Sequence, residues 1–136
     1  MAPRHHWVLD GNNLFGARAR GWWRDRAGAA RRLAADVDRW QHAVGDPVTL
    51  VFDGHRPENA DVQDREGLTI RWAESSDRDA ADHVIVALVE DLYAETPDLT
   101  VVTSDRGLRE RLPPGVRIEG AGSFNRRLEP SAEDGG

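Results

Sequence analysis

Aspartates follow three apolar runs of the chain, in each case at or just after the end of the run. Asp10 ends the run 7–9, Asp53 follows 48–52, and Asp105 comes shortly after 99–102. Apolar, β-branched runs bounded by turn residues are typical of buried strands, and in open α/β sheets ligands bind just outside the carboxyl ends of the strands. A single aspartate at such a position more often caps the next helix. Its threefold repetition favours a shared site for a metal ion or a polar substrate.

Two more aspartates, Asp79 and Asp82, stand near the start of an apolar helix expected over residues 75–93. Their spacing of three places both side chains on one helix face. Capping of free amides accounts for acids early in a helix. It accounts poorly for Asp82, because the chain around it is almost wholly apolar and an acid there is costly without a positive partner. We therefore assign Asp82 a metal-facing role and Asp79 a supporting one, and we leave His83 as a structural residue.

Convergence of these carboxylates predicts a hard divalent cation. Several ionised carboxylates within a few ångströms repel one another unless a cation joins them. The chain has no cysteine and no convincing histidine cluster, so the oxygen ligands indicate Mg²⁺ or Mn²⁺. Such ions activate water and stabilise in-line displacement at phosphorus. The predicted site is therefore a phosphodiesterase centre.

A basic segment over residues 15–39 supplies a candidate surface for nucleic acid. It carries seven arginines against three aspartates, although the net charge of the chain is -6. Guanidinium groups bind phosphates while bases stack on aromatic rings. We accordingly predict contacts with single-stranded nucleic acid for Trp22, Trp23, Arg24 and Arg26. The alternative, a solvated helix face with both tryptophans packed on the core, is equally compatible with the pattern.

The composition excludes several other classes of protein. All 18 basic residues are arginine, and the lack of lysine excludes Schiff-base chemistry and the phosphate-binding lysine of P-loop proteins. It also argues against a haloacid-dehalogenase-like phosphatase and a phosphoacceptor receiver domain. Without cysteine there is no disulfide, thiol nucleophile or thiolate zinc site. No apolar stretch reaches the length of a membrane span or resembles a signal peptide, so we expect a cytoplasmic protein without membrane association.

The elements that must position these residues alternate along the chain. Strands are expected over residues 7–10, 48–52, 68–72, 99–103 and 116–118, and helices over 30–44, 75–93 and 108–112. This alternation implies a parallel sheet covered on both faces, within one domain. The first helix buries a stripe of apolar residues that includes Trp40 and Val44. His5 and His6 are expected in a solvated terminal lead.

Four motifs follow one another along the chain: Leu9-Asp10-Gly11-Asn12-Asn13, Phe52-Asp53-Gly54, Asp79-Ala80-Ala81-Asp82 and Val102-Thr103-Ser104-Asp105-Arg106. In order and spacing they resemble those of NYN domains in the PIN-like nuclease superfamily, with YacP-like bacterial ribonucleases the most similar. The resemblance covers residues 8–118. It implies a PIN-like three-layer α/β/α sandwich with a mainly parallel central sheet. We expect this domain over residues 1–128, followed by a disordered tail over 129–136.

The resemblance implies that the protein is a divalent-metal-dependent ribonuclease that hydrolyses single-stranded RNA with Mg²⁺ or Mn²⁺, and it indicates an endonuclease without excluding exonucleolytic cleavage. The family's metal ligands correspond to Asp10, Asp82 and Asp105, and Asp79 is a further catalytic acid. Asn13 is expected to orient a phosphate or a metal-coordinated water, and Arg106 to contact substrate. Association with the ribosome is a further implication, although residues 121–127 do not match the family's usual C-terminal segment. A catalytically silent RNA-binding or toxin–antitoxin-type module of the same fold is the alternative.

Overall fold

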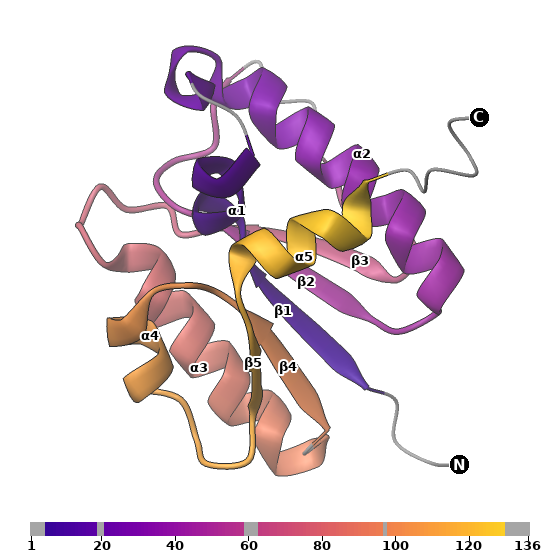
Figure 1. Ribbon diagram of the computed structural model, residues 1–136. Helices are drawn as coiled ribbons and strands as arrows, with labels where there is room; N and C mark the ends of the chain where they lie inside the picture. Colours follow the sequence, from indigo (N-terminus) through magenta and orange to yellow (C-terminus); the bar gives the residue numbers. More distant parts are fainter. Residues whose placement is uncertain (1–4, 19–20, 59–62, 97, 130–136) are drawn as a thin grey trace.

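A five-stranded sheet lies at the centre of the computed structural model, which describes residues 5–18, 21–58, 63–96 and 98–129 (Figure 1). The strands are β1 (His6–Asp10), β2 (Val48–Phe52), β3 (Leu68–Trp72), β4 (Leu99–Val102) and β5 (Arg117–Glu119). They lie in the order β3-β2-β1-β4-β5, and every neighbouring pair is parallel. The expected α/β fold is confirmed, with a sheet that is parallel throughout.

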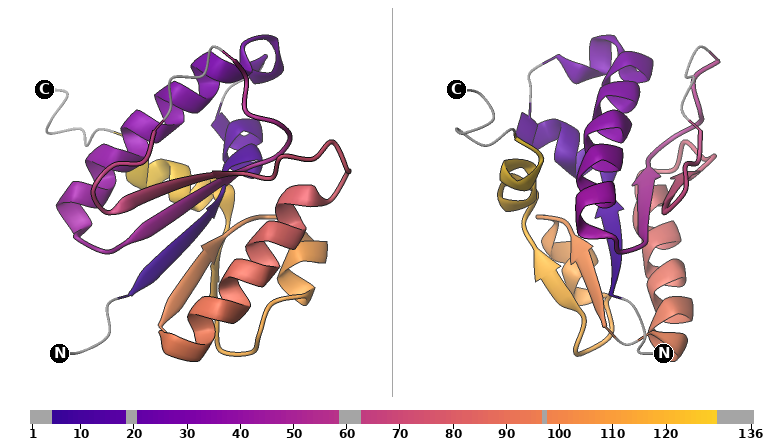
Figure 2. Two further views of the ribbon diagram at one scale, coloured as in Figure 1. Left: turned by 180° about the vertical axis from the view of Figure 1, so that it is seen from behind. Right: turned by 90° about the vertical axis from the view of Figure 1, so that its right-hand side faces the viewer.

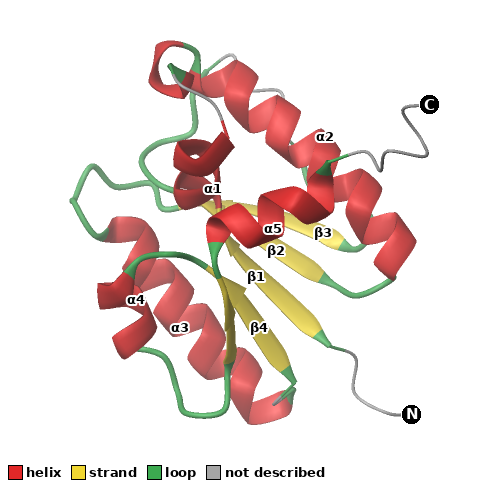
Figure 3. Ribbon diagram, viewed as in Figure 1, coloured by secondary structure: helices red, strands yellow, loops and turns green. Residues whose placement is uncertain are grey.

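Helices cover both faces of the sheet (Figures 2 and 3). On one face, α1 (Gly11–Arg18), α2 (Arg26–Val44) and α5 (Ala121–Leu128) share a core with the side chains of Trp7, Leu9, Leu50 and Phe52. On the other face, α3 (Ala80–Glu95) and α4 (Arg106–Glu110) pack against Val8, Val51 and Val101. Because both faces are covered, every residue of β2 is buried, as is typical of parallel strands. The arrangement is a three-layer α/β/α sandwich consistent with the PIN-like fold.

The strand order reverses at one place, between β1 and β4. The chain runs outward from β1 to β2 and β3, and then returns to place β4 and β5 on the other side of β1. At such a reversal the connections leave toward opposite faces, which opens a crevice at the carboxyl ends of the strands. Asp10 ends β1, and Asp105 lies three residues beyond the end of β4. Both acids therefore flank this crevice.

The helix α5 is absent from the elements expected from the sequence. Its buried residues Ala121, Phe124 and Leu128 are spaced three and four apart, and the Phe124 ring lies edge-on to Trp40 with centroids 4.9 Å apart. Gly122 lowers the helix propensity of this short segment, and Gly120 stands just before it, which explains why the sequence pattern does not predict the helix. The eight-residue helix closes the core over α1 and α2 (Figure 3).

Two smaller expectations are wrong. His5 and His6 are not a solvated lead, because His5 Nε2 lies 2.7 Å from Thr100 Oγ1 and His6 Nε2 lies 3.1 Å from Thr49 Oγ1. These contacts tie the start of β1 to its two neighbours. Val44 does not belong to the buried stripe, since 42 % of its surface is exposed.

The ends of the chain add little to this description. Of the tail expected after residue 128, residues 130–136 lie outside the described part of the chain. Within that part, none of the helices has the length and apolar character needed to cross a membrane.

Candidate active site

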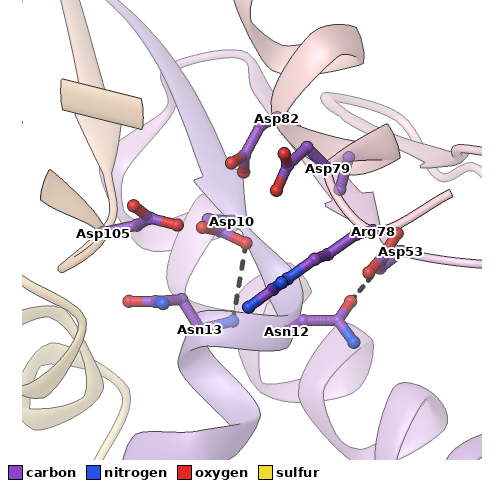
Figure 4. A pocket seen from close by; sticks show the side chains of 9 residues that line it. Asp10, Asn12, Asn13, Asp53, Arg78, Asp79, Asp82 and Asp105 are labelled. Carbon is purple, nitrogen blue, oxygen red and sulfur yellow. Dashed lines mark hydrogen bonds between the residues drawn. The ribbon is translucent and has the colours of Figure 1, made fainter. Parts of the chain in front are cut away.

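One pocket opens at the carboxyl edge of the sheet, and all five aspartates singled out from the sequence line it (Figure 4). Its lining residues are Asp10, Asn12, Asn13, Asp53, Arg78, Asp79, Ala81, Asp82 and Asp105. They come from the ends of β1 and β2, from α1 and α3, and from the loops that precede α3 and α4. The topology thus brings together residues that are up to 95 positions apart in the sequence.

Asp10 is almost fully buried, with 5 % of its surface exposed. The Thr103 hydroxyl donates to its Oδ2 at 2.9 Å, and the Asn13 N–H approaches its Oδ1 at 3.5 Å, the outer limit of a hydrogen bond. Burial raises the pKa of Asp10 to about 6, against the effect of these two hydrogen bonds. The negative charges of Asp82 and Asp105 contribute to the same rise in the pKa. Capping of α1 is therefore at most a minor role for Asp10.

Asp82 lies in the first turn of α3 and is half-buried. Burial raises its pKa, and the charges of Asp105 and Asp79 raise it further. Asp79 occupies the N-cap position of α3, yet among the described amides of that turn none donates to its side chain. Its carboxylate lies beside that of Asp82 at the pocket (Figure 4). Capping therefore does not account for Asp79.

Asp105 both caps a helix and faces the pocket. Its Oδ1 accepts from the backbone N–H of Gly107 at 2.8 Å and of Leu108 at 3.3 Å, at the start of α4. Its own N–H donates to Thr103 Oγ1 at 3.1 Å. Since the Thr103 hydroxyl donates to Asp10, one side chain links two of the acids. The capping role is real for Asp105, but a carboxylate has a second oxygen and further lone pairs with which to bind a cation.

The two asparagines after Asp10 brace the neighbouring strand ends. Asn13 Oδ1 accepts from the Ser104 N–H at 2.7 Å, which joins α1 to the loop after β4. Asn12 Oδ1 accepts from the Asp53 N–H at 2.6 Å, which joins α1 to the turn after β2. Both residues line the pocket. Asn13 therefore has a bracing role besides the substrate contact expected for it.

Arg78 is a residue of this pocket that sequence reasoning missed, and its side chain extends across the pocket toward Asn12 and Asn13 (Figure 4). An arginine between two aspartates of a polar loop has no distinctive pattern in the sequence. The loop is placed by long-range backbone bonds, from Ala73 N–H to the Phe52 carbonyl at 2.9 Å and from Glu74 N–H to the Gly54 carbonyl at 3.0 Å. Thr103 was also missed, although its place two residues before Asp105 in the fourth motif is a clue.

Part of the basic segment lies directly beside the acids. A second pocket, the Trp23 groove, is lined by Asn12, Trp23, Arg26, Asp53, Gly54, His55 and Ser76. It shares Asn12 and Asp53 with the acidic pocket. Trp23 belongs to the short helix η1 (Trp22–Arg24) and is 59 % exposed. The alternative of a tryptophan packed on the core therefore does not hold for Trp23, while the Trp22 side chain lies outside the described part of the structure.

The arginines predicted to bind substrate differ in their surroundings. Arg26 is half-buried and its Nη2 donates to the Asp53 carbonyl at 3.1 Å. Arg24 and Arg106 are exposed, in η1 and at the first position of α4. The structure thus joins Arg26 to the turn that carries Asp53 and leaves Arg24 at the surface next to Trp23.

The chemistry of the acidic pocket fits a hard divalent cation. Within the described ranges, no three His, Asp or Glu side chains form a ready-made ligand set. The carboxylates of Asp10, Asp82 and Asp105 are nevertheless close enough to raise the pKa values of Asp10 and Asp82. A divalent cation would relieve this repulsion, and oxygen donors without thiolates suit Mg²⁺ or Mn²⁺.

Comparison with known proteins places the chain in a family. Residues 7–113 match the family of YacP-like NYN domains. The crystal structure of Rae1 (YacP) from Bacillus subtilis is similar with a TM-score of 0.71 and 21% identity, over 90% of this chain and 72% of that one. The crystal structure of its W164L mutant is similar with a TM-score of 0.67 and 20% identity, over 91% of this chain and 74% of that one. A comparison with curated proteins gave no match. The chain belongs to the family of YacP-like NYN domains.

Proposed function

We propose that this protein is a divalent-metal-dependent ribonuclease that cleaves single-stranded RNA internally by hydrolysis of phosphodiester bonds. The observation that carries the proposal is the convergence of Asp10, Asp82 and Asp105 on one pocket at the reversal of strand order. Buried and mutually repelling carboxylates are costly, and they are typical of sites that bind a cation. Membership of a nuclease family supports the same reaction.

In this proposal Asp10, Asp82 and Asp105 hold the ion, which is Mg²⁺ or Mn²⁺. Such an ion, when bound, polarises a phosphoryl oxygen and makes water a better nucleophile. Hydrolysis joins the oxygen of water to phosphorus and breaks one P–O ester bond, and the leaving oxygen takes up a proton. Thr103 fixes Asp10 relative to the loop of Asp105. Asp79, which lines the same pocket, is proposed to accept a proton from the attacking water.

Guanidinium groups around the pocket supply the positive charge that RNA requires. Arg78 extends across the pocket toward Asn12 and Asn13 (Figure 4), and Arg106 is exposed immediately after Asp105. Arg24 adds an exposed charge beside the Trp23 groove. We propose that these three residues contact phosphates of the bound strand. Trp22 and Trp23, in the same short helix, are proposed to contact its bases.

A catalytically silent RNA-binding or toxin–antitoxin-type module is the second candidate. It is favoured by Arg78, a cationic side chain that lines the same pocket and can attract an RNA phosphate without a metal. Both candidates bind RNA, so binding alone does not separate them. They differ in whether RNA is hydrolysed when a divalent cation is present.

The test is an incubation of purified protein with an end-labelled, unstructured RNA in Mn²⁺, in Mg²⁺ and in EDTA. The proposed ribonuclease yields internal cleavage products with either ion and none in EDTA. A protein that binds the same RNA in a gel-shift assay, but leaves it intact under all three conditions, would establish the silent module instead.

A further inference from the structure

The Trp23 groove has the features of a site for a nucleobase. We infer that Trp23 stacks on one unpaired base of the RNA, in the nucleotide next to the bond that the acidic pocket cleaves. This inference rests on the proposed ribonuclease function and specifies how that site selects single-stranded substrate. It is carried by the exposure of Trp23, by the way its backbone is held and by the adjacency of the two pockets.

The exposure of Trp23 is unusual for this protein. Among the described residues, only Trp23 and Val44 are large hydrophobic side chains with exposed surfaces, of 59 % and 42 %. Val44 lies in the last turn of α2, whereas Trp23 borders a groove next to five carboxylates. An indole offers a large flat surface to any base, whatever its sequence, because every base has a π-face.

The backbone of Trp23 is held within η1 and joined to the start of α2. The Arg24 N–H donates to the Gly21 carbonyl at 3.0 Å within η1. The next residue, Asp25, caps α2 by accepting from the Gly28 N–H at 2.9 Å. Arg26 then joins the start of α2 to the Asp53 carbonyl. The same Asp53 turn contributes a carboxylate to the acidic pocket, so the backbone that carries the indole has a defined place relative to the acids.

The two pockets adjoin each other. Asn12 and Asp53 line both, which places the Trp23 groove directly beside the acids. A strand whose phosphate lies at the acids can therefore place the adjoining base in the groove. The sharing of these residues decides which nucleotide Trp23 contacts.

The polar groups of the groove suit a neutral base better than a second phosphate. Asp53 lines the groove, and Glu74 lies beside it with Oε2 3.3 Å from His55 Nδ1. Arg26 donates to the Asp53 carbonyl. The two carboxylates outnumber the one guanidinium that lines the groove, so its interior does not favour an anion, whereas the edge of a base can exchange hydrogen bonds with the His55 ring and the Ser76 hydroxyl. A base held in this way cannot also be paired within a duplex, which explains a requirement for single-stranded RNA.

The test measures RNA binding in EDTA by fluorescence anisotropy, so that cleavage does not enter the readout. A labelled, unstructured oligoribonucleotide is compared with variants that carry one abasic site at each successive position. The proteins are wild type, Trp23→Ala, Trp23→Phe and the matched control Val44→Ala, each checked by thermal melting. Cleavage of the parent RNA in Mn²⁺ then locates the critical position relative to the bond that breaks.

We expect Trp23→Ala to weaken binding about tenfold, in the range found for loss of one stacked base. Trp23→Phe should retain most of the affinity, and Val44→Ala all of it. One abasic position next to the cleaved bond should weaken binding to wild type by the same factor and have no further effect in Trp23→Ala. Equal abasic effects in both proteins, or unchanged affinity in Trp23→Ala, would overturn the inference. Failure of the ribonuclease proposal gives a different result. The RNA then stays intact in Mn²⁺, while one abasic position still weakens binding to wild type and has no effect in Trp23→Ala.

Discussion

Replacement of Asp10 by asparagine should stabilise the metal-free protein at neutral and alkaline pH. Folding raises the pKa of Asp10 from 3.8 to about 6, and each pKa unit corresponds to about 1.4 kcal/mol. Ionised Asp10 therefore costs the folded state about 3 kcal/mol above pH 6. Asparagine removes this cost and can still accept from the Thr103 hydroxyl. After about 1 kcal/mol is subtracted for less favourable hydrogen bonding, a gain of about 2 kcal/mol remains.

The sign of the pH dependence follows from the raised pKa. Below pH 3.8 Asp10 is protonated in both states and its contribution to stability is fully present. As pH rises through 3.8 and on to about 6, the unfolded state loses its proton first and this stability is lost. The difference between Asp10→Asn and wild type should therefore be near zero at pH 4, grow until about pH 6, and stay constant above it.

Urea unfolding in EDTA at a series of pH values from 4 to 8 measures this difference. Asp91→Asn is the matched control, since Asp91 is exposed on α3. At pH 8 a gain of about 2 kcal/mol corresponds to a rise in melting temperature of about 7 °C for a domain of this size. A variant that is less stable than wild type at pH 8, or a difference that does not change with pH, would refute the reasoning.

Three further predictions follow from the contacts of the site. Mn²⁺ at a hundred times its dissociation constant should raise the free energy of unfolding of the wild type by about 2.7 kcal/mol. Thermal melts should show a smaller rise in melting temperature with Mn²⁺ for Asp105→Asn, and an equal rise would remove Asp105 from the ligands. Thr103→Val keeps the shape of the side chain but removes the hydroxyl that donates to Asp10. Calorimetry should then show about 10- to 100-fold weaker metal binding, and unchanged binding would deny Thr103 a positioning role. In a plot of the logarithm of RNA affinity against the logarithm of salt concentration, Arg24→Glu should reduce the slope by about 0.7 for each phosphate that Arg24 neutralises in wild type. The control is Arg117→Glu, at the opposite edge of the sheet, and equal slopes for both variants would place Arg24 outside the RNA path.

The sequence was sufficient to predict the place of the site because parallel strands end at one edge. Asp10, Asp53 and Asp105 each follow an apolar run, and the parallel sheet brings those ends together. The apolar surroundings of Asp82 were equally informative, since an unexplained acid beside apolar residues needs a reason to be there. For Asp105 the pattern was ambiguous, and the structure shows that capping and exposure to the pocket occur together.

The contacts that fix these acids could not be predicted in the same way. The Thr103 hydroxyl meets Asp10 across 93 positions of sequence, and Arg26 meets the Asp53 carbonyl across 27. Such pairs depend on how loops settle against one another, which no local periodicity records. Arg78 is placed by backbone bonds of the preceding residues to the turn after β2. The unpredicted α5 has a different cause, because two glycines obscure the apolar spacing of a short helix.

The central claim, that the converging carboxylates hydrolyse RNA, is tested most directly by the single-turnover rate of RNA cleavage in Mn²⁺ for Asp82→Asn. The comparison is with Asp91→Asn, an exposed position on the same helix, with enzyme in excess over RNA so that weaker binding does not limit the rate. Loss of one negative ligand removes a large part of the electrostatic stabilisation of the transition state, which predicts a rate lower by a factor of about 100 or more. Asp91→Asn should cleave at the wild-type rate. Cleavage by Asp82→Asn at the rate of Asp91→Asn would contradict the claim and place the chemistry outside this pocket.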